Sequence, residues 1–487
     1  MLLSRIIYGE KADMKGKDVE IRSVYSYSKK RVDNGLFFCL DGRRLNGEDF
    51  IEEAEKFGAA AAVCERMPER KTGLTIVIVP DVRSAYAVFC SRFYSEPEKR
   101  LKIIGVVGTN GKTSTTRITE YILSEAGYKV GVIGTEGSFM AGEEYAPRSL
   151  TTPDPEELYP ILKRFADDGA THVVMEVSAH AIELKKTEPI FFETLIFTNC
   201  TEDHLDYFSD LESYKNVKKS IFLKKKSKYY VIGTDDDCGL EIALELLKKG
   251  ADGVKTYGIF RPSDVFAAIV TESADKTSFV LNYFDELFNV KTRLLGTFNV
   301  YNCLAAVTCA CLEGVKPEVA ADALRTVPPV KGRMQLVSSY RGAQIFVDYA
   351  HTPDGLEKSL LYLRKVTKGS LFALFGCGGN RDVSKRPLMG KTAGDIADFV
   401  ILTSDNPRFE DQMKIISDVE AGLKESTLDY VVIKDRKAAI SYAISQLEKG
   451  DSLLIAGKGA EDYQEVMGVK HDFCDELVVR EITGENI

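Results

Sequence analysis

The sequence predicts an α/β protein with largely parallel sheets in two of three successive domains. Its 487 residues exceed what one hydrophobic core usually serves and suggest roughly three domains of ordinary size. From Leu101 onward, apolar runs bounded by turn residues alternate with helical patterns, which is typical of parallel strands connected by helices. The run at 103–107 stops at a glycine-punctuated turn that leads into a helical pattern.

The first block, residues 1–100, mixes short apolar runs with helical patterns. Its clearest strand candidates are Leu36–Leu40 and Ala59–Cys64. The block ends at the polar segment Ser95–Arg100, which we interpret as a linker.

The second block, residues 101–330, contains four further strand candidates, at 129–134, 171–177, 193–199 and 228–233. Their alternation with helices predicts a parallel sheet with helices on both faces and a ligand site at the carboxyl ends of its strands. A second boundary falls near residues 328–332, Pro-Pro-Val-Lys-Gly. The third block, residues 331–487, predicts a second α/β sheet, with strand candidates at 343–351, 370–376, 397–405, 428–434 and 451–459.

Composition indicates a globular protein that folds in water, since 44% of its residues are hydrophobic and 28% are charged. The net charge of −9 excludes a general nucleic-acid binder, which needs clustered excess cation. The apolar start Met1–Tyr8 is too short for a membrane span or a signal peptide, so we expect a cytoplasmic protein without a membrane span. The ten cysteines are scattered without a C-x-x-C pair, which favours reduced thiols in the core.

The turn at residues 108–114 is a candidate phosphate cradle. Backbone N–H groups of such a turn, the positive end of the following helix and the Lys112 ammonium can together surround a polyphosphate, while the Thr113 hydroxyl can bind Mg²⁺. The expected ligand is a nucleoside triphosphate. Val106 stands where the longer G-x-x-x-x-G-K-[ST] pattern has glycine, and the alternative is an ordinary glycine-rich turn between a strand and a helix.

Two polar residues at strand ends are candidate partners of Thr113 in holding Mg²⁺. Glu176 ends the run at 171–177 and His204 follows the run at 193–199. Each has an alternative, because Glu176 could be an exposed strand end and His204 a helix cap. Asp203 and Asp206 are competing candidates. The nearby lysines at 215, 218, 219 and 224–226 have the spacing of a solvated helix face, which singles out none of them.

Eleven motifs occur in an order that resembles the Mur ligases, specifically the UDP-N-acetylmuramoyl-tripeptide synthetases of peptidoglycan synthesis. They are GTNGKTST, TTPDP at 151–155, EVSAHAIE at 176–183, FTNCTEDHLDYF at 197–208, SYKNVKKSIF at 213–222, GTFNVYNCLAA at 296–306, GRMQ at 332–335, VDYAHTPD at 347–354, GCGGNRDVSKRPLMG at 376–390, TSDNPR at 403–408 and AGKGAE at 456–461. The resemblance implies a uridine-nucleotide-binding domain over residues 1–100, a central ATP-binding ligase domain over 101–330, and a C-terminal Rossmann-like domain over 331–487 that binds the amino-acid substrate.

The resemblance also implies roles for particular residues. A carboxylate of a nucleotide-linked dipeptide would attack the γ-phosphate of ATP, and an incoming amine would then displace phosphate from the acyl phosphate. Thr113 and Glu176 would bind one Mg²⁺, and His204 with a carbamylated Lys218 a second, since a carbamate turns the lysine into an anionic oxygen ligand. The catalytic set is Lys112, Glu176, His204 and Lys218. The implied ATP-binding residues are Gly108, Thr109, Asn110, Gly111, Lys112, Thr113, Ser114, Asn302, Arg333 and Asp348.

Two further residue sets would bind the other substrates. The set for the muramoyl nucleotide is Ser28, Thr151, Thr152, Ser178 and Lys186, and the set for meso-diaminopimelate is Arg381, Asp405, Asn406, Pro407, Arg408, Gly457 and Glu461. The Arg408 guanidinium and the Glu461 carboxylate suit the distal carboxylate and ammonium of diaminopimelate, whereas lysine has no distal carboxylate. Departures from the family pattern fall mainly on the nucleotide positions, at Tyr27, Lys29, Ala179, Leu184, Lys186, Phe208 and Ala460.

The residues and the resemblance together lead to three hypotheses about function. The first is an ATP-dependent amide ligase that adds meso-diaminopimelate to UDP-N-acetylmuramoyl-L-alanyl-D-glutamate, acting as a monomer on small-molecule substrates. The second is a paralogous ligase with another diamino acid or another acceptor, and the third is a catalytically silent nucleotide-binding scaffold. Retention of Lys112, Thr113, Glu176, His204 and Lys218 argues against the scaffold.

Overall fold

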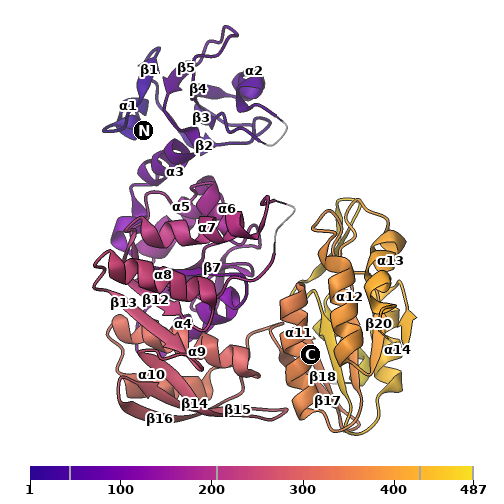
Figure 1. The fold of residues 1–487 in the computed structure, drawn as a ribbon. Coiled ribbons are helices and arrows are strands. Elements are labelled where there is room, and N and C mark those ends of the chain that lie inside the picture. Colours follow the sequence, from indigo (N-terminus) through magenta and orange to yellow (C-terminus); the bar gives the residue numbers. More distant parts are fainter. Residues whose placement is uncertain (43–44, 204–206, 427–428, 485–487) are drawn as a thin grey trace. The chain divides into compact units, whose positions relative to one another are not determined.

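The computed structural model describes residues 1–42, 45–203, 207–426 and 429–484. They form two compact units, the first made of residues 1–106, 127–195 and 220–229, and the second of the remaining described residues. Three larger sheets follow one another along the chain (Figure 1). A small two-stranded sheet is formed by β23 (Tyr463–Val466) and β24 (Val469–Asp472) near the end of the chain.

The N-terminal sheet has five strands in the order β1-β5-β4-β3-β2. The predicted runs at 36–40 and 59–64 are confirmed as β3 and β4, which pair in parallel with the buried Phe37 opposite the buried Ala62. The bounds are β1 (Asp13–Lys15), β2 (Ser23–Tyr25), β3 (Gly35–Phe38), β4 (Ala59–Cys64), β5 (Thr75–Ile78), with helices α1 (Leu3–Ile7), α2 (Ile51–Lys56) and α3 (Val82–Phe93) and the 3-10 turn η1 (Gly47–Phe50).

The segment interpreted as a linker is ordered and partly buried. Residues Pro97–Arg100 form a 3-10 turn, and both Pro97 and Glu98 are buried. Glu98 accepts a 2.6 Å hydrogen bond from the Ser91 hydroxyl of α3, which compensates the burial of its polar head. The segment is therefore folded and packed against α3, and its role as a linker between domains stays a prediction.

The central sheet has eleven strands in the order β16-β15-β14-β13-β12-β11-β6-β10-β7-β8-β9. All four strand candidates and the first run are confirmed as β6 (Lys102–Val107), β7 (Val130–Gly134), β10 (His172–Glu176), β11 (Phe192–Phe197) and β12 (Ser227–Gly233). The remaining strands are β8 (Gly137–Met140), β9 (Glu143–Ala146), β13 (Val254–Gly258), β14 (Val265–Glu272), β15 (Thr277–Tyr283) and β16 (Glu286–Thr292).

Both edges of this sheet are antiparallel, which the prediction of a parallel sheet missed. β8 pairs with β7 and β9, and β15 pairs with β14 and β16. The hairpin turns use left-handed backbone, with positive φ at Gly142 (83°) and at Asp285 (85°). The helices of the central region are α4 (Lys112–Glu125), α5 (Pro155–Asp167), α6 (Ala179–Glu183), α7 (Leu211–Leu223), α8 (Asp237–Lys248), α9 (Thr297–Leu312) and α10 (Pro317–Thr326).

The C-terminal sheet has six strands in the order β17-β18-β22-β19-β20-β21, which confirms the predicted second α/β sheet. Its helices pack on both faces. Alternate residues of one strand enter different cores. Phe346 of β18 packs in a cluster with residues of α11, α12 and α13, whereas its neighbours Ile345 and Val347 pack with residues of α14 and α15. The bounds are β17 (Gln335–Tyr340), β18 (Ala343–Asp348), β19 (Leu371–Phe375), β20 (Phe399–Leu402), β21 (Tyr430–Val432), β22 (Ser452–Ala456), α11 (Pro353–Val366), α12 (Lys385–Ile396), α13 (Gln412–Leu423), α14 (Arg436–Gln446) and α15 (Asp475–Thr483).

The structure describes all ten cysteines, which the sequence predicts as reduced thiols in the core. Nine of the ten cysteines are buried as free thiols, and Cys311 is half-buried. None of the helices formed by the described residues combines the length and the apolar character that a bilayer crossing requires.

Candidate active site

The predicted phosphate cradle forms at the junction of β6 and α4. Gly111 precedes the helix with a φ of +85°, a conformation that favours glycine. Neighbouring side chains also exclude a Cβ atom from both glycines of the turn, since it would lie 1.8 Å from Thr198 Oγ1 at Gly108 and 2.5 Å from Asn302 Oδ1 at Gly111. Thr198 and Asn302 therefore pack closely against the cradle. Its backbone N–H groups lie at the N-terminus of a helix, where they can bind an anion.

Residues after β11 fix the turn. The Asn110 N–H donates to Asn199 Oδ1 at 2.9 Å, and the Asn110 carbonyl accepts from Thr198 Oγ1 at 2.7 Å. The Lys112 ammonium donates to the carbonyls of Gly108 and Thr109, each at 2.9 Å. The positive charge thus lies over the loop, where a polyphosphate would be held.

Three predicted ATP-binding residues come from outside the turn, namely Asn302, Arg333 and Asp348, and the first two lie beside the cradle. Arg333 donates to Thr113 Oγ1 at 2.9 Å, and its guanidinium lies 4.1 Å from the centre of the Tyr349 ring. Asn302 accepts from Thr115 Oγ1 at 3.2 Å. Ser114 is buried in the first turn of α4.

The third, Asp348, binds backbone groups close to Arg333. Its carboxylate accepts from the N–H groups of Met334 at 2.7 Å and Ala350 at 2.6 Å. Burial raises the pKa of Asp348 to about 6, against the opposing effect of Arg333. In the described structure this carboxylate organises the chain around Arg333, and its implied contact with ribose stays a prediction.

Lys218 is the lysine that burial distinguishes on α7. Its side chain is fully enclosed, its ammonium donates to Thr109 Oγ1 at 2.6 Å, and it lies 3.9 Å from the centre of the Tyr214 ring. Burial lowers the pKa of Lys218 to about 8, so a larger fraction is neutral amine near neutral pH than for an exposed lysine. Lys219, its neighbour, instead pairs with Glu241 at 2.8 Å near the surface.

Three polar side chains near Lys218 or Asp203 were not predicted from the sequence, and they are Cys200, Cys238 and His351. The Lys218 ammonium lies 3.7 Å from Cys200 Sγ, and the pKa of Cys200 is lowered to about 7, first by a hydrogen bond with Cys238. His351 Nε2 lies 3.9 Å from Asp203 Oδ2, and burial lowers the pKa of His351 to about 4. Isolated Cys and His residues give no sequence signal for such proximity.

The predicted magnesium ligands are placed in part. Thr113 lies in the first turn of α4, Glu176 ends β10, and His204 and Asp206 lie outside the described residues. A hydroxyl, a carboxylate and a modified lysine are oxygen donors, which fits the preference of Mg²⁺. Within residues 1–42, 45–203, 207–426 and 429–484, no group of three or more His, Cys, Asp or Glu side chains is arranged to hold a metal ion.

Four of the five residues predicted to bind the muramoyl nucleotide lie together around the end of β10. Thr152 Oγ1 donates to the Glu176 carbonyl at 2.9 Å and accepts from the Ser178 N–H at 3.0 Å. Thr151 lies beside Thr152, and its hydroxyl is 3.2 Å from that of Thr135. Lys186 is buried, and its ammonium donates to the Thr152 carbonyl at 3.1 Å and pairs with Asp154 at 2.8 Å.

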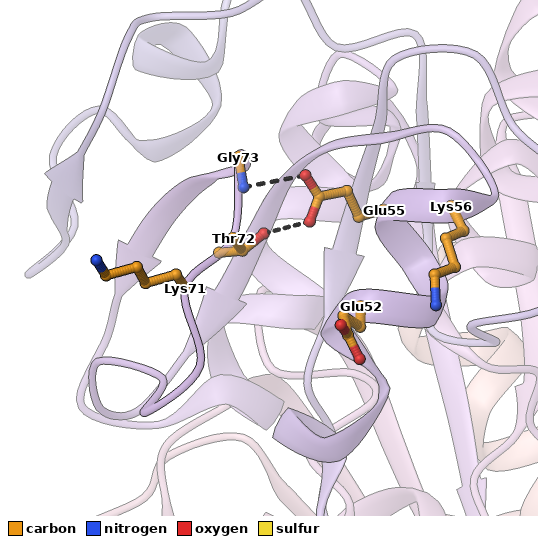
Figure 2. Close-up of a pocket in the computed structure, with 6 residues that line it drawn as sticks. All are labelled: Glu52, Glu55, Lys56, Lys71, Thr72 and Gly73. Carbon is orange, nitrogen blue, oxygen red and sulfur yellow. Dashed lines mark hydrogen bonds between the residues drawn. The ribbon is translucent and has the colours of Figure 1, made fainter.

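The fifth residue, Ser28, belongs to the N-terminal region and is buried. Its hydroxyl donates to the Glu53 carboxylate of α2 at 2.6 Å. Two residues along the same helix, Glu55 accepts hydrogen bonds from the Thr72 hydroxyl at 2.7 Å and the Gly73 N–H at 3.0 Å, and these three residues line the pocket of Figure 2. None of the residues that line this pocket belongs to the predicted set, and its mixed charges suggest no particular ligand.

The predicted amino-acid pocket is assembled from three separate segments. Asn406 Nδ2 donates to Glu461 Oε2 at 2.8 Å, which joins residues 405–408 to residues 457–461. Gly457 has a φ of +107°, and a Cβ there would lie 2.6 Å from Asp405 Oδ2. Arg408 donates to the Gly379 carbonyl at 2.8 Å.

Ion pairs in this pocket add two residues that the sequence did not indicate. Arg408 Nε lies 3.3 Å from Glu465, and Glu461 lies 3.0 Å from the fully buried Lys458. A Cβ at Gly378 would lie 3.0 Å from Arg408 and 3.7 Å from Arg381 Cγ, so the two arginines flank this glycine. Pro407 lies between Asn406 and Arg408 in the string, and its carbonyl accepts from the Glu410 N–H at 3.0 Å.

An α/β sheet that carries a glycine-bounded phosphate cradle at its strand ends is the mark of a nucleotide-binding domain. Comparison with family descriptions matches residues 106–310 to the Mur ligase middle domain and residues 332–459 to the Mur ligase, glutamate ligase domain.

Individual relatives extend this likeness over the whole chain. The UDP-N-acetylmuramoyl-L-alanyl-D-glutamate–2,6-diaminopimelate ligase of Geobacillus thermodenitrificans is 40% identical over 479 residues, which cover 97% of this chain and 96% of the relative. The enzyme of the same name from Aquifex aeolicus is 41% identical over 459 residues, covering 94% and 92%. The chain therefore belongs to the Mur ligase family.

Solved structures give the same fold. A structure of a UDP-N-acetylmuramoyl-L-alanyl-D-glutamate–2,6-diaminopimelate ligase has a TM-score of 0.68 at 33% identity and covers 95% of both chains. The MurF ligase of Thermotoga maritima, solved in complex with ADP, has a TM-score of 0.61 at 20% identity and covers 95% of this chain and 97% of that chain, which supports the fold alone. The three-domain α/β architecture, with a central ATPase domain and a C-terminal Rossmann-like domain, is thus confirmed.

Proposed function

We propose that this protein is the ATP-dependent ligase that adds meso-2,6-diaminopimelate to the D-glutamate of UDP-N-acetylmuramoyl-L-alanyl-D-glutamate. The observation that carries the proposal is the full-length likeness to ligases of that name, which includes the C-terminal segments that form the candidate amino-acid pocket. The domain boundaries near residues 100 and 330, a cytoplasmic location and a monomeric state belong to the same proposal.

The cradle would serve the first half of the reaction. A carboxylate oxygen of the acceptor attacks the γ-phosphorus of ATP, the bond to the β-phosphate oxygen breaks, and ADP leaves. Lys112 and the backbone N–H groups of α4 stabilise the negative charge that spreads over the transferred group. Mg²⁺ held by Thr113 and Glu176 would neutralise phosphate charge, and a carbamate on Lys218 would supply an anionic oxygen ligand for a second ion.

The amino-acid pocket would serve the second half. The amine of the incoming amino acid attacks the acyl carbon, the bond from that carbon to the bridging oxygen breaks, and phosphate leaves with that oxygen. The amide forms as the attacking amine releases a proton to solvent. Arg408 would hold the distal carboxylate of diaminopimelate by its guanidinium fork, and Glu461 would face the distal ammonium. Lysine lacks that carboxylate, so its binding would leave the guanidinium with only its partners in the protein, Glu465 and the Gly379 carbonyl.

The experiment is a phosphate-release assay with the muramoyl dipeptide, ATP, Mg²⁺ and a panel of diamino acids, with the product identified by mass. We expect phosphate release that depends on both the acceptor and meso-diaminopimelate, with L-lysine a poor substrate. Equal use of lysine would favour a paralogous ligase with a different amino acid. Phosphate release with other acceptors but none with the muramoyl dipeptide would favour a different carboxylate substrate.

A further inference from the structure

The carboxylate of Glu176 is held by one neighbouring residue on both of its oxygens. The Thr135 N–H donates to Glu176 Oε1 at 2.9 Å, and the Thr135 hydroxyl donates to Oε2 at 3.1 Å. Glu176 is only 2% exposed, so these bonds act away from competing water. The carboxylate plane is thereby set by the turn that follows β7.

Gly134, the residue before Thr135, makes this approach possible. A Cβ atom at Gly134 would lie 2.3 Å from Glu176 Oε1 and 3.0 Å from its carboxyl carbon, closer than atoms approach without displacement. Gly134 and Thr135 therefore form a close-fitting backbone turn around the Glu176 carboxylate.

Thr135 also contacts Thr151, which is predicted to bind the muramoyl nucleotide. The two hydroxyl oxygens are 3.2 Å apart. A carboxylate oxygen only accepts, so the single hydroxyl proton of Thr135 is committed to Glu176. The Thr135 oxygen must then accept the hydrogen bond from the Thr151 hydroxyl. The single hydroxyl proton of Thr151 therefore points to Thr135, which leaves the Thr151 oxygen able to accept a further hydrogen bond.

We propose that Thr135 is a positioning residue that couples the metal side of the site to the acceptor side. It fixes the orientation of the Glu176 carboxylate toward Mg²⁺, and it turns the Thr151 hydroxyl so that its oxygen accepts a hydrogen bond from an N–H or O–H donor of the acceptor nucleotide. This inference rests on the proposed function, because it takes Glu176 as a metal ligand and Thr151 as an acceptor contact.

The test compares Thr135→Val, which keeps the size but removes the hydroxyl, with Thr135→Ser, which keeps the hydroxyl. Mn²⁺ binding to the complex with a nonhydrolysable ATP analogue is measured by electron paramagnetic resonance, and binding of the muramoyl dipeptide nucleotide by calorimetry without metal. Because removing a residue that orients a metal ligand costs about 10-fold or more in metal affinity, we expect that loss for Thr135→Val. We also expect acceptor affinity to fall about 10-fold, as for a lost buried hydrogen bond, with values for Thr135→Ser close to native.

Thr171→Val is the matched control, since Thr171 precedes β10 at its other end and its hydroxyl bonds to the Lys129 carbonyl. It should leave both affinities unchanged. Thermal unfolding of each variant separates a loss of fold from a loss of positioning, and Thr135→Ala, which also removes the hydroxyl, provides the reading if Thr135→Val does not fold. Native affinities in a folded Thr135→Val would overturn the inference, whereas absence of ligase turnover in the native protein would overturn the proposed function instead.

Discussion

The phosphate cradle and the amino-acid pocket differ in how the chain builds them. The cradle at residues 108–113 is made by consecutive backbone and by two glycines that Thr198 and Asn302 crowd. The pocket is made by side chains from segments around residues 378–381, 405–408 and 457–465, joined by bonds such as Asn406 to Glu461. The candidate phosphate site therefore depends mainly on local backbone, whereas the candidate amino-acid site depends on side chains that only the fold brings together.

The largest effect we expect is at the cradle. Lys112→Ala should lower kcat/KM by about 1,000-fold or more, because the ammonium serves charge that develops on the transferred phosphoryl group. The measurement is steady-state phosphate release with thermal unfolding as the check on fold. Near-normal turnover by the folded variant would show that the cradle does not take part in phosphoryl transfer, and the comparison with the amino-acid pocket would then no longer hold.

The next effect concerns Lys218. Its ammonium contacts Thr109 of the cradle, although Lys218 comes from a different helix. Lys218→Ala should abolish most turnover, and short-chain carboxylic acids should restore part of it if the missing group is an anionic metal ligand. Lys219→Ala is the matched control on the same helix and should remain active, since Lys219 pairs with Glu241 near the surface. Full activity of Lys218→Ala without additive would place Lys218 outside the site.

A smaller and more selective effect is expected in the pocket. Arg408→Lys keeps the charge but loses the planar fork, so the KM for diaminopimelate should rise about 10-fold or more while the KM for ATP stays near its native value. Kinetics with each substrate varied in turn measure both. Parallel increases in the two KM values would show that Arg408 supports the fold of the whole site rather than substrate choice.

The last effect is on stability rather than on turnover, at Asp348. Its pKa is raised from 3.8 to about 6 in the folded protein, so folding favours the protonated form. The stabilising contribution is present below pH 4 and is lost as pH rises through 6, by at most about 3 kcal/mol. The unfolding free energy of the native protein minus that of Asp348→Asn should therefore fall between pH 4 and pH 6 and be level above; a difference independent of pH would refute this account.

The contrast also explains what the sequence could predict. The cradle and the strands around it are local patterns, so spacing alone placed Lys112 and Thr113 at the start of a helix. The burial of Lys218 among six similar lysines depends on tertiary packing, and only the resemblance singled it out. Thr135, Lys458 and Glu465 were missed because each acts through a partner that only the fold brings close. The antiparallel edge strands were missed because the alternation of strands and helices indicates only the parallel part of a sheet.

The central claim is that the protein activates a carboxylate by phosphorylation before forming an amide. The most direct test uses a muramoyl dipeptide labelled with ¹⁸O in the carboxylate that reacts, with ATP, Mg²⁺ and meso-diaminopimelate, and determines the mass of the released phosphate. Because the acyl oxygen leaves with the phosphoryl group, each turnover should transfer one ¹⁸O atom to inorganic phosphate. Unlabelled phosphate formed together with the amide product would contradict the account.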